Sequence, residues 1–293
     1  MVLATNLPAK PTKPSPSALV VYVTPAAAAD RLPTLQAILA AYANAPSLTP
    51  KILDHTPAKL KQKDLQNLPS GSLLLDGDTL SLLSHGAHEQ PLRVAPHWQT
   101  LQQRVVTAGK KSELLLKAAK IQPCMRVLDA TAGFGHDSLI LASTGASVTM
   151  LEREPALFVL LAFEGATMQQ HAHWHRLLAR LTLYFTDFTA WQMPNDLPAF
   201  DRVLLDPMFP TASYTSAVNK HMQALHTLTL VPNFAEQIAL LQHAASVLTD
   251  DGRVLVKRPK TAPFLADLPP QDSTTNALIR FDSYRKADLA ALS

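Results

Sequence analysis

The stretch VLDATAGFGHD, residues 127–137, carries the pattern that decides the fold. An apolar run leads into an acid, Asp129, and two glycines follow, Gly133 and Gly135. Apolar residues then return at helical spacing, so the stretch predicts a buried strand, a tight glycine turn and the start of a helix. Because glycine carries no Cβ, such a turn brings bare backbone close to a ligand.

The composition is that of a globular protein. Apolar residues make up 47% of the 293, and the net charge of +3 permits nucleic-acid binding without indicating it. The single cysteine, Cys124, excludes an internal disulfide framework, and we expect it to be a small buried residue. No apolar run approaches the roughly 18–20 residues that span a bilayer. We therefore expect a soluble, cytoplasmic protein without a membrane partner.

Two domains are predicted. From Arg126 onward strand and helix patterns alternate, which predicts an α/β fold with a mostly parallel sheet covered on both faces. Residues 1–92 are rich in proline and predict a small α+β domain, and we expect its first residues, up to about 17, to be poorly ordered. Residues 93–293 form the second predicted domain.

Some elements are predicted with definite bounds. In the first domain the spacing predicts a helix over residues 30–43, and residues 77–78 separate two apolar runs as in a hairpin. In the second domain, residues 251–252 (Asp-Gly) predict a turn into a strand over residues 253–256.

Four acids follow or end the first four strands predicted from Arg126 onward. They are Asp129, Glu152, Asp187 and Asp206. In a parallel sheet the carboxyl ends of the strands share one edge, and ligands bind there. The sequence therefore predicts that these acids meet at one rim.

The glycine turn departs from a dinucleotide-binding turn. That turn reads G-x-G-x-x-G, whereas Ser138 stands here in place of the third glycine. Asp129 also precedes Gly133 by four residues, and a carboxylate so close is unfavourable for a pyrophosphate. S-adenosylmethionine carries an ammonium and a sulfonium, so it suits this acid better. A purely structural strand–helix turn is the alternative, because a lone G-x-G is weak evidence.

The next two strand ends favour an adenosyl ligand. Glu152 has the spacing of an acid that accepts hydrogen bonds from both ribose hydroxyls. Asp187 and Phe188 have the chemistry to bind the adenine amine and to pack on its ring. The alternatives are a surface glutamate, and a loop acid beside a core aromatic.

The sequence DPMFP (residues 206–210) predicts the chemistry. An exocyclic base amine is a poor nucleophile because its lone pair is delocalised into the ring. Asp206 and the Pro207 carbonyl can hold its two hydrogens, and Phe209 can stack on the base. Methyl transfer would then depend mainly on positioning and would need no metal. A simple Asp-Pro turn is the alternative.

Two further patterns have plain explanations. His171, His173 and His175 alternate, but no cysteine or acid cluster accompanies them, so we predict a polar loop and no metal site. Residues 257–260 (KRPK) follow the fifth strand on the same rim and would either meet RNA phosphates or form a solvated turn.

The motifs taken together resemble a known family. In residue and order, DATAGFGHD, LERE (151–154), LDPMFP, VKRP (256–259) and RFDSY (280–284) are similar to the ribosomal RNA small subunit methyltransferase J (RsmJ) family. The resemblance covers residues 92–285 approximately. It implies a class I, Rossmann-like S-adenosylmethionine-dependent methyltransferase. The implied reaction methylates the N2 amine of one guanosine in 16S rRNA of the small ribosomal subunit.

The chemistry of DPMFP gives Asp206, Pro207 and Phe209 as the residues that meet the amine. The resemblance implies a set of cofactor contacts. The chain differs from the family at several positions. His136 stands where the family usually has arginine, so a titratable group replaces a fixed charge. Asp187 and Phe188 stand where small or hydroxyl residues are usual. The implied cofactor contacts are His136, Asp137, Glu152, Arg153, Asp187, Phe188 and Asp206.

Three other interpretations stay open. The first keeps the chemistry and changes the target to another RNA or DNA base. The second is a non-catalytic RNA-binding protein on the same fold, which the intact Asp206, Pro207 and Phe209 argue against. The third is a nicotinamide oxidoreductase, which the missing third glycine disfavours. The sequence indicates no oligomeric state.

Overall fold

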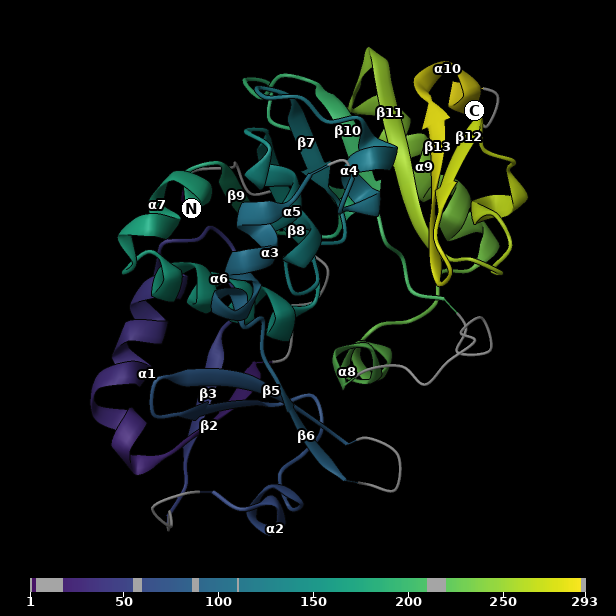
Figure 1. Cartoon of the computed structure of the whole chain (residues 1–293). Helices are drawn as coiled ribbons and strands as arrows, with labels where there is room; N and C mark the ends of the chain where they lie inside the picture. Colours follow the sequence, from purple (N-terminus) through teal and green to yellow (C-terminus); the bar gives the residue numbers. More distant parts are fainter. Residues whose placement is uncertain are drawn as a thin grey trace.

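The structure is a computed structural model that describes residues 2–3, 18–54, 60–85, 90–109, 111–209 and 220–290. Its strands form two sheets (Figure 1). The predicted disorder of the first residues falls mostly outside this part of the chain. Within it, β1 (Val2–Leu3) pairs with a strand of the larger sheet.

The smaller sheet comes from the N-terminal part, in the order β3–β2–β4–β5–β6. The predicted hairpin is confirmed, since Gly77, with φ of 53°, lies between the antiparallel β4 and β5. The elements are β2 (Leu19–Val23), α1 (Pro25–Ala40), β3 (Leu48–Ile52), α2 (Gln62–Leu65), β4 (Leu73–Asp76), β5 (Thr79–His85) and β6 (Pro91–Val94).

Helix α1 begins at Pro25, earlier than the predicted start near residue 30. Proline suits the first turn of a helix because its missing N–H has no intrahelical partner there. A second proline, Pro33, lies inside the helix.

The larger sheet has the order β1–β9–β8–β7–β10–β11–β13–β12. All neighbours pair in parallel up to β11, and β13 and β12 are antiparallel. The strand order reverses between β7 and β10, so the predicted Rossmann-like α/β fold is confirmed. The strands are β7 (Arg126–Asp129), β8 (Ser147–Glu152), β9 (Leu181–Phe185), β10 (Phe200–Leu205), β11 (Leu248–Pro259), β12 (Asp272–Thr275) and β13 (Ile279–Arg285).

Helices cover both faces of this sheet (Figure 1). Successive side chains of a strand point to opposite faces. Val127 packs on the face of α5 and α6, whereas its neighbour Leu128 packs on the face of α9. The helices and 3-10 turns are η2 (Trp98–Leu101), α3 (Gln102–Thr107), α4 (Leu114–Ala119), α5 (His136–Ser143), α6 (Pro155–Met168), α7 (Ala172–Leu178), η3 (Phe188–Ala190), α8 (Lys220–Leu228), α9 (Phe234–Ser246), η5 (Leu265–Asp267) and α10 (Lys286–Leu289).

The two sheets share one hydrophobic core. Helix α6 contacts both β5 and α1, and the Tyr42 ring meets Phe158 edge-on at 5.2 Å between centroids. The division into two domains at residue 92 stays a prediction. That position lies inside β6, which ends at Val94.

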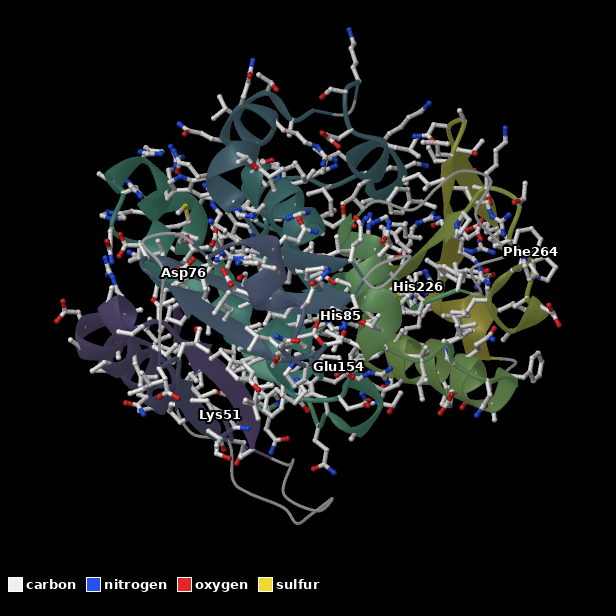
Figure 2. All side chains as sticks on the ribbon, turned by 90° about the horizontal axis from the view of Figure 1, so that it is seen from below. Lys51, Asp76, His85, Glu154, His226 and Phe264 are labelled. Atoms are coloured by element: carbon white, nitrogen blue, oxygen red, sulfur yellow. The ribbon has the colours of Figure 1, made fainter. Side chains whose placement is uncertain are left out.

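Helix α8 lies against β5 and β6 of the smaller sheet (Figure 1). Ala224 is fully buried there, and the Thr227 hydroxyl is 3.3 Å from that of Ser84. In Figure 2, His85 and His226 mark β5 and α8 on this side of the molecule. The smaller sheet therefore anchors the segment that follows the DPMFP loop.

Strand β11 runs through residues 251–252, so the predicted turn there is wrong. Phe200 of β10 lies opposite Leu248, whereas Arg202 lies opposite Arg253, and the extra residues between them bulge within β11. The Asp-Gly pair belongs to that bulge and does not start the strand.

Two predictions about other residues are also wrong. The histidine-rich segment forms α7, because Trp174 and Leu178, four residues apart, supply a buried helical stripe. Cys124 is exposed and not buried. Its φ of 68° places it in the turn before β7, where its N–H donates to the Gly145 carbonyl.

Candidate active site

The carboxyl ends of β7, β8, β9 and β10 border one large cleft with a volume of about 2860 Å³. Asp129, Glu152, Asp187 and Asp206 all line it, so the structure brings together the four acids that follow these strands in the sequence. Pockets for drug-sized ligands hold roughly 300–1,000 Å³. The cleft therefore has room for more than one small molecule.

The two glycines of the turn have different roles. Gly133 lines the cleft with φ of 55°, and its N–H donates to Glu152 Oε2 at 2.8 Å. Gly135 faces the interior, where an added Cβ would lie 2.8 Å from Trp98 Cζ2 and 2.9 Å from Leu161 Cδ2. The predicted cofactor contact thus fits the geometry of Gly133, whereas Gly135 is required by packing.

Asp129 is buried, with 2% of its surface exposed. The Ser138 hydroxyl donates to its Oδ2 at 2.5 Å, and the Thr131 N–H donates to its Oδ1 at 3.3 Å. Burial raises the pKa of Asp129 to about 7, although the bond from Ser138 favours the ionised form. Ser138, which replaces the third glycine of a dinucleotide turn, is therefore part of the support for this acid.

Glu152 holds the glycine turn against β8. Its Oε2 accepts from the Gly133 N–H and its Oε1 from the Glu154 N–H, both at 2.8 Å. Burial raises the pKa of Glu152 to about 7, against the effect of these bonds. The carboxylate oxygens keep further lone pairs, so the acid can still accept hydrogen bonds from a ligand hydroxyl.

A partly buried charge cluster connects the glycine turn to the DPMFP loop. The Lys257 Nζ lies 2.7 Å from Asp137 Oδ2 and 2.8 Å from Asp206 Oδ2. Burial disfavours ionised Asp137, but the Lys257 ammonium outweighs it and lowers the pKa of Asp137. At Asp206 burial prevails over Lys257 and the pKa is raised. Burial also opposes the charge of Lys257, but the two carboxylates outweigh it and raise its pKa.

The described residues after β10, 206–209, begin at the cleft and lead into the core. Asp206, Pro207 and Met208 line the cleft, and the Asp206 N–H donates to Thr131 Oγ1 at 2.7 Å. Phe209 is only 4% exposed, and the Arg258 guanidinium lies 4.2 Å from its ring centroid. The predicted stacking of Phe209 on a base is therefore not available in this geometry, because Arg258 covers the ring.

Residues after β8 and β9 line the opposite part of the cleft. The Asp187 carboxylate accepts from the Thr189 N–H at 2.9 Å and lies 3.5 Å from Arg153 Nη1. Phe188 lines the cleft but is 3% exposed, with its ring edge-on to His243 at 4.7 Å. Asp187 and Arg153 thus offer accessible polar groups, whereas Phe188 offers little surface.

His136 begins α5 and lines the cleft. Its Nε2 lies 2.8 Å from the Pro96 carbonyl oxygen, so this nitrogen is the donor. Pro96 lies in the linker that follows β6. Trp98, two residues later, also contacts the glycine turn, because its indole N–H donates to the Phe134 carbonyl at 2.8 Å. His136 therefore fastens the linker between the two sheets to the glycine turn.

The sequence did not predict that Lys257 forms ion pairs with Asp137 and Asp206 in the cleft. It assigned residues 257–260 to RNA phosphates or to a solvated turn. The signal was the alternation along β11: Val256 and Arg258 are buried on one face, which turns Lys257 toward the rim of acids. Thr131 and Ser138, which support Asp206 and Asp129, also carried no recognisable signal.

The donor set suits a cationic ligand with hydroxyl groups. Carboxylates line the cleft together with Gly133, where an added Cβ would come within 4 Å only of the Thr131 carbonyl oxygen, at 3.9 Å. They belong to Asp129, Asp137, Glu152 and Asp206. A diphosphate would be repelled by such a set. In the described part of the chain no three His, Cys, Asp or Glu side chains form a metal-binding group. Nor does any described helix have the length and apolar character needed to cross a membrane.

Comparison with known proteins also indicates a methyltransferase that uses S-adenosylmethionine. A family model described as a putative SAM-dependent methyltransferase, where SAM is S-adenosylmethionine, matches residues 51–286. Ribosomal RNA small subunit methyltransferase J from Psychrobacter cryohalolentis is 42% identical over 276 residues, covering 87% of this chain and 92% of that protein. The protein of the same name from Psychrobacter arcticus is 46% identical over 249 residues, covering 77% and 82%.

A solved structure supports the fold. The crystal structure of a SAM-dependent methyltransferase from Neisseria gonorrhoeae aligns with a TM-score of 0.64 and 26% sequence identity, covering 91% of this chain and 96% of that one. The predicted cofactor, S-adenosylmethionine, is confirmed by the family model and by this similarity. The chain therefore belongs to the ribosomal RNA small subunit methyltransferase J family and is an S-adenosylmethionine-dependent methyltransferase.

Proposed function

We propose that this protein methylates the exocyclic N2 amine of a guanosine in 16S rRNA of the small ribosomal subunit, with S-adenosylmethionine as the methyl donor. The names of the relatives support ribosomal RNA as the substrate. The observation that carries the amine as acceptor is Asp206, a carboxylate at the cleft directly after β10 and followed by Pro207. Ribosomal RNA as substrate implies that the protein acts in the cytoplasm.

The residues of the loop provide what an amine needs. Asp206 and the Pro207 carbonyl accept its two hydrogens, which favours a pyramidal nitrogen with an available lone pair. Lys257 holds Asp206 Oδ2, so Oδ1 is the oxygen for the amine. Bound S-adenosylmethionine would supply an electrophilic methyl group, and the break of the bond between that methyl and the sulfonium sulfur would leave S-adenosylhomocysteine. The protein contributes mainly by positioning, and the amine proton leaves to solvent afterwards.

The residues around the glycine turn would hold the cofactor. Glu152 would accept the ribose hydroxyls and Asp129 would face the cationic end. Asp187 would accept from the adenine amine, next to Phe188. The other candidate contacts that line the cleft are Gly133, His136, Asp137 and Arg153.

The acceptor can be tested by transfer of labelled methyl groups. Small ribosomal subunits from cells lacking the protein, naked 16S rRNA and duplex DNA would be compared as substrates. We expect label in N2-methylguanosine on small subunits or 16S rRNA and none on DNA. Transfer only to DNA would favour the alternative of another base. Transfer to none of these substrates would contradict the proposal.

A substitution tests the role of Asp206. Asp206→Asn keeps the size of the side chain and loses the charge, and we expect turnover to fall at least ~100-fold while RNA binding is retained. Asp251→Asn is the control, because this acid is exposed on β11 and does not line the cleft. Unchanged turnover in Asp206→Asn would refute the assigned role. No turnover in the wild-type protein, with RNA bound, would favour a non-catalytic binder.

A further inference from the structure

The ammonium of Lys257 joins two parts of the active site that are distant in sequence. Asp137 lies in the first turn of α5, directly after the glycine turn, and Asp206 begins the loop after β10. Lys257 Nζ lies within 2.8 Å of a carboxylate oxygen of each, and its side chain is 25% exposed. One side chain of β11 thus connects the cofactor turn to the acceptor loop.

The surroundings of Lys257 require a cation. The titratable groups that face the cluster are Asp129 from β7, His136 and Asp137 from α5, Asp206 from the loop after β10, and Arg104 from α3. Without the ammonium, the carboxylates of Asp137 and Asp206 would repel one another with no counter-ion between them. Arg104 does not replace it, because its guanidinium pairs with Glu113 at 2.7 Å.

Three contacts fix the residues that follow β10, and the ion pair of Lys257 with Asp206 is one of them. The Asp206 N–H donates to Thr131 Oγ1 at 2.7 Å, and the guanidinium of Arg258 stacks on Phe209 at 4.2 Å. Successive residues of β11 point to opposite faces, so Lys257 contacts Asp206 at the start of the loop and Arg258 contacts Phe209 three residues later. Of the three, Lys257 alone contacts the carboxylate of Asp206.

We infer that Lys257 is a positioning residue: its ammonium fixes the Asp206 carboxylate for the methyl acceptor and ties it to the cofactor-binding turn. The inference rests on the proposed function, in which Asp206 accepts a hydrogen of the amine. Lys257 acts through Asp206 and takes no proton from the acceptor.

Steady-state kinetics of Lys257→Met test this inference. Methionine has a similar length and no charge, so Asp206 loses both its orientation and its counter-ion. We expect kcat to fall about a hundredfold, because misplacement of a reacting group by about 1 Å costs that much. The KM for small subunits and the dissociation constant of S-adenosylhomocysteine should stay within about threefold of wild type.

The pH profile separates positioning from a general structural role. Loss of the ammonium raises the pKa of Asp206, so the acidic limb of kcat should move to higher pH in Lys257→Met. Lys257→Arg keeps the charge with a different shape, so part of the kcat should return and the limb should stay near that of wild type. Lys63→Met, on α2 at the far end of the smaller sheet (Figure 1), is the control and should match wild type.

A second variant covers failure of Lys257→Met to fold. The double variant Asp137→Asn with Lys257→Met removes the ion pair without leaving excess negative charge, and it should show the same low kcat. A wild-type kcat and pH profile in either folded variant would overturn the inference. Failure of the proposed function is a different result, because then the wild-type protein itself would transfer no methyl group to small subunits or 16S rRNA.

Discussion

Gly135 and Gly133 both adopt positive φ within one turn, but their surroundings differ. An alanine at 135 would place its Cβ 2.8 Å from Trp98 Cζ2 in addition to the cost of the left-handed backbone. We expect Gly135→Ala to lower the free energy of unfolding by roughly 3 kcal/mol. Chemical denaturation followed by far-ultraviolet circular dichroism measures it.

The control for this variant is Gly77→Ala. Gly77 has a φ of 53° with no atom within 4 Å of the added Cβ, so only the backbone cost of about 1 kcal/mol applies. Equal losses in the two variants would show that the packing against Trp98 is unimportant.

The raised pKa of Glu152 predicts that cofactor binding depends on pH. Its pKa is raised by burial from 4.5 to about 7, so the protonated form stabilises the fold below pH 4.5, and this stability is lost as the pH rises through about 7. The ionised form is the better acceptor for ribose hydroxyls. We therefore expect the affinity for S-adenosylhomocysteine to fall by up to about tenfold per pH unit below 7.

Calorimetric titration at pH 6, 7 and 8 checks this expectation. Glu152→Gln has no group to titrate at this position, so its pH dependence should be weaker. Some dependence should remain, because burial also raises the pKa of Asp129 to about 7. The same slope in wild type and Glu152→Gln would contradict the assignment of Glu152.

At the residue scale, the sequence predicted positions better than environments. Asp129, Glu152 and Asp206 line the cleft because strand ends and spacing determine where they fall. Phe209 was expected at the base, but the aromatic residue alone does not reveal that Arg258 covers it. Lys257 was expected either to meet RNA phosphates or to lie in a solvated turn. Its ion pairs could not be predicted, because the carboxylates around it come from distant parts of the chain.

At the scale of elements, the packing of α8 on the smaller sheet predicts that this sheet affects methyl transfer. Ala224 is fully buried on α8, which packs against β5 and β6. Ala224→Asp would place a charge in that contact and detach α8 from the sheet. We expect the KM for small subunits to rise or kcat to fall at least ~10-fold, with unchanged binding of S-adenosylhomocysteine.

Ala235→Asp is the matched control for α8. It makes the same change on an exposed position of α9, where an acid in the first turn is tolerated. Methyl transfer by this variant should equal that of wild type. If Ala224→Asp also behaves as wild type, the smaller sheet does not act on the reaction through α8.

Elements with a clear apolar period were predicted well, and those set by distant contacts were not. The hairpin of β4 and β5 and the strands β7 to β10 carry their own pattern. β12 has the sequence DSTT and is a strand only because it pairs with β13. The bulge of β11 likewise depends on its pairing with β10, which local sequence does not specify.

For the whole molecule, the sequence predicted the large parallel sheet and its binding edge. It did not predict how the smaller sheet joins it, since contacts such as Tyr42 with Phe158 link residues far apart in the chain. If the proposed function holds, one guanosine of 16S rRNA carries an N2-methyl group that this protein adds with the help of Asp206.

Mass-spectrometric mapping of 16S rRNA nucleosides tests that claim most directly. The rRNA would be taken from cells with the wild-type protein, without it, and with Asp206→Asn in its place. We predict one N2-methylguanosine that is present with the wild-type protein and missing from the other two. An identical set of modified nucleosides in all three samples would contradict the account.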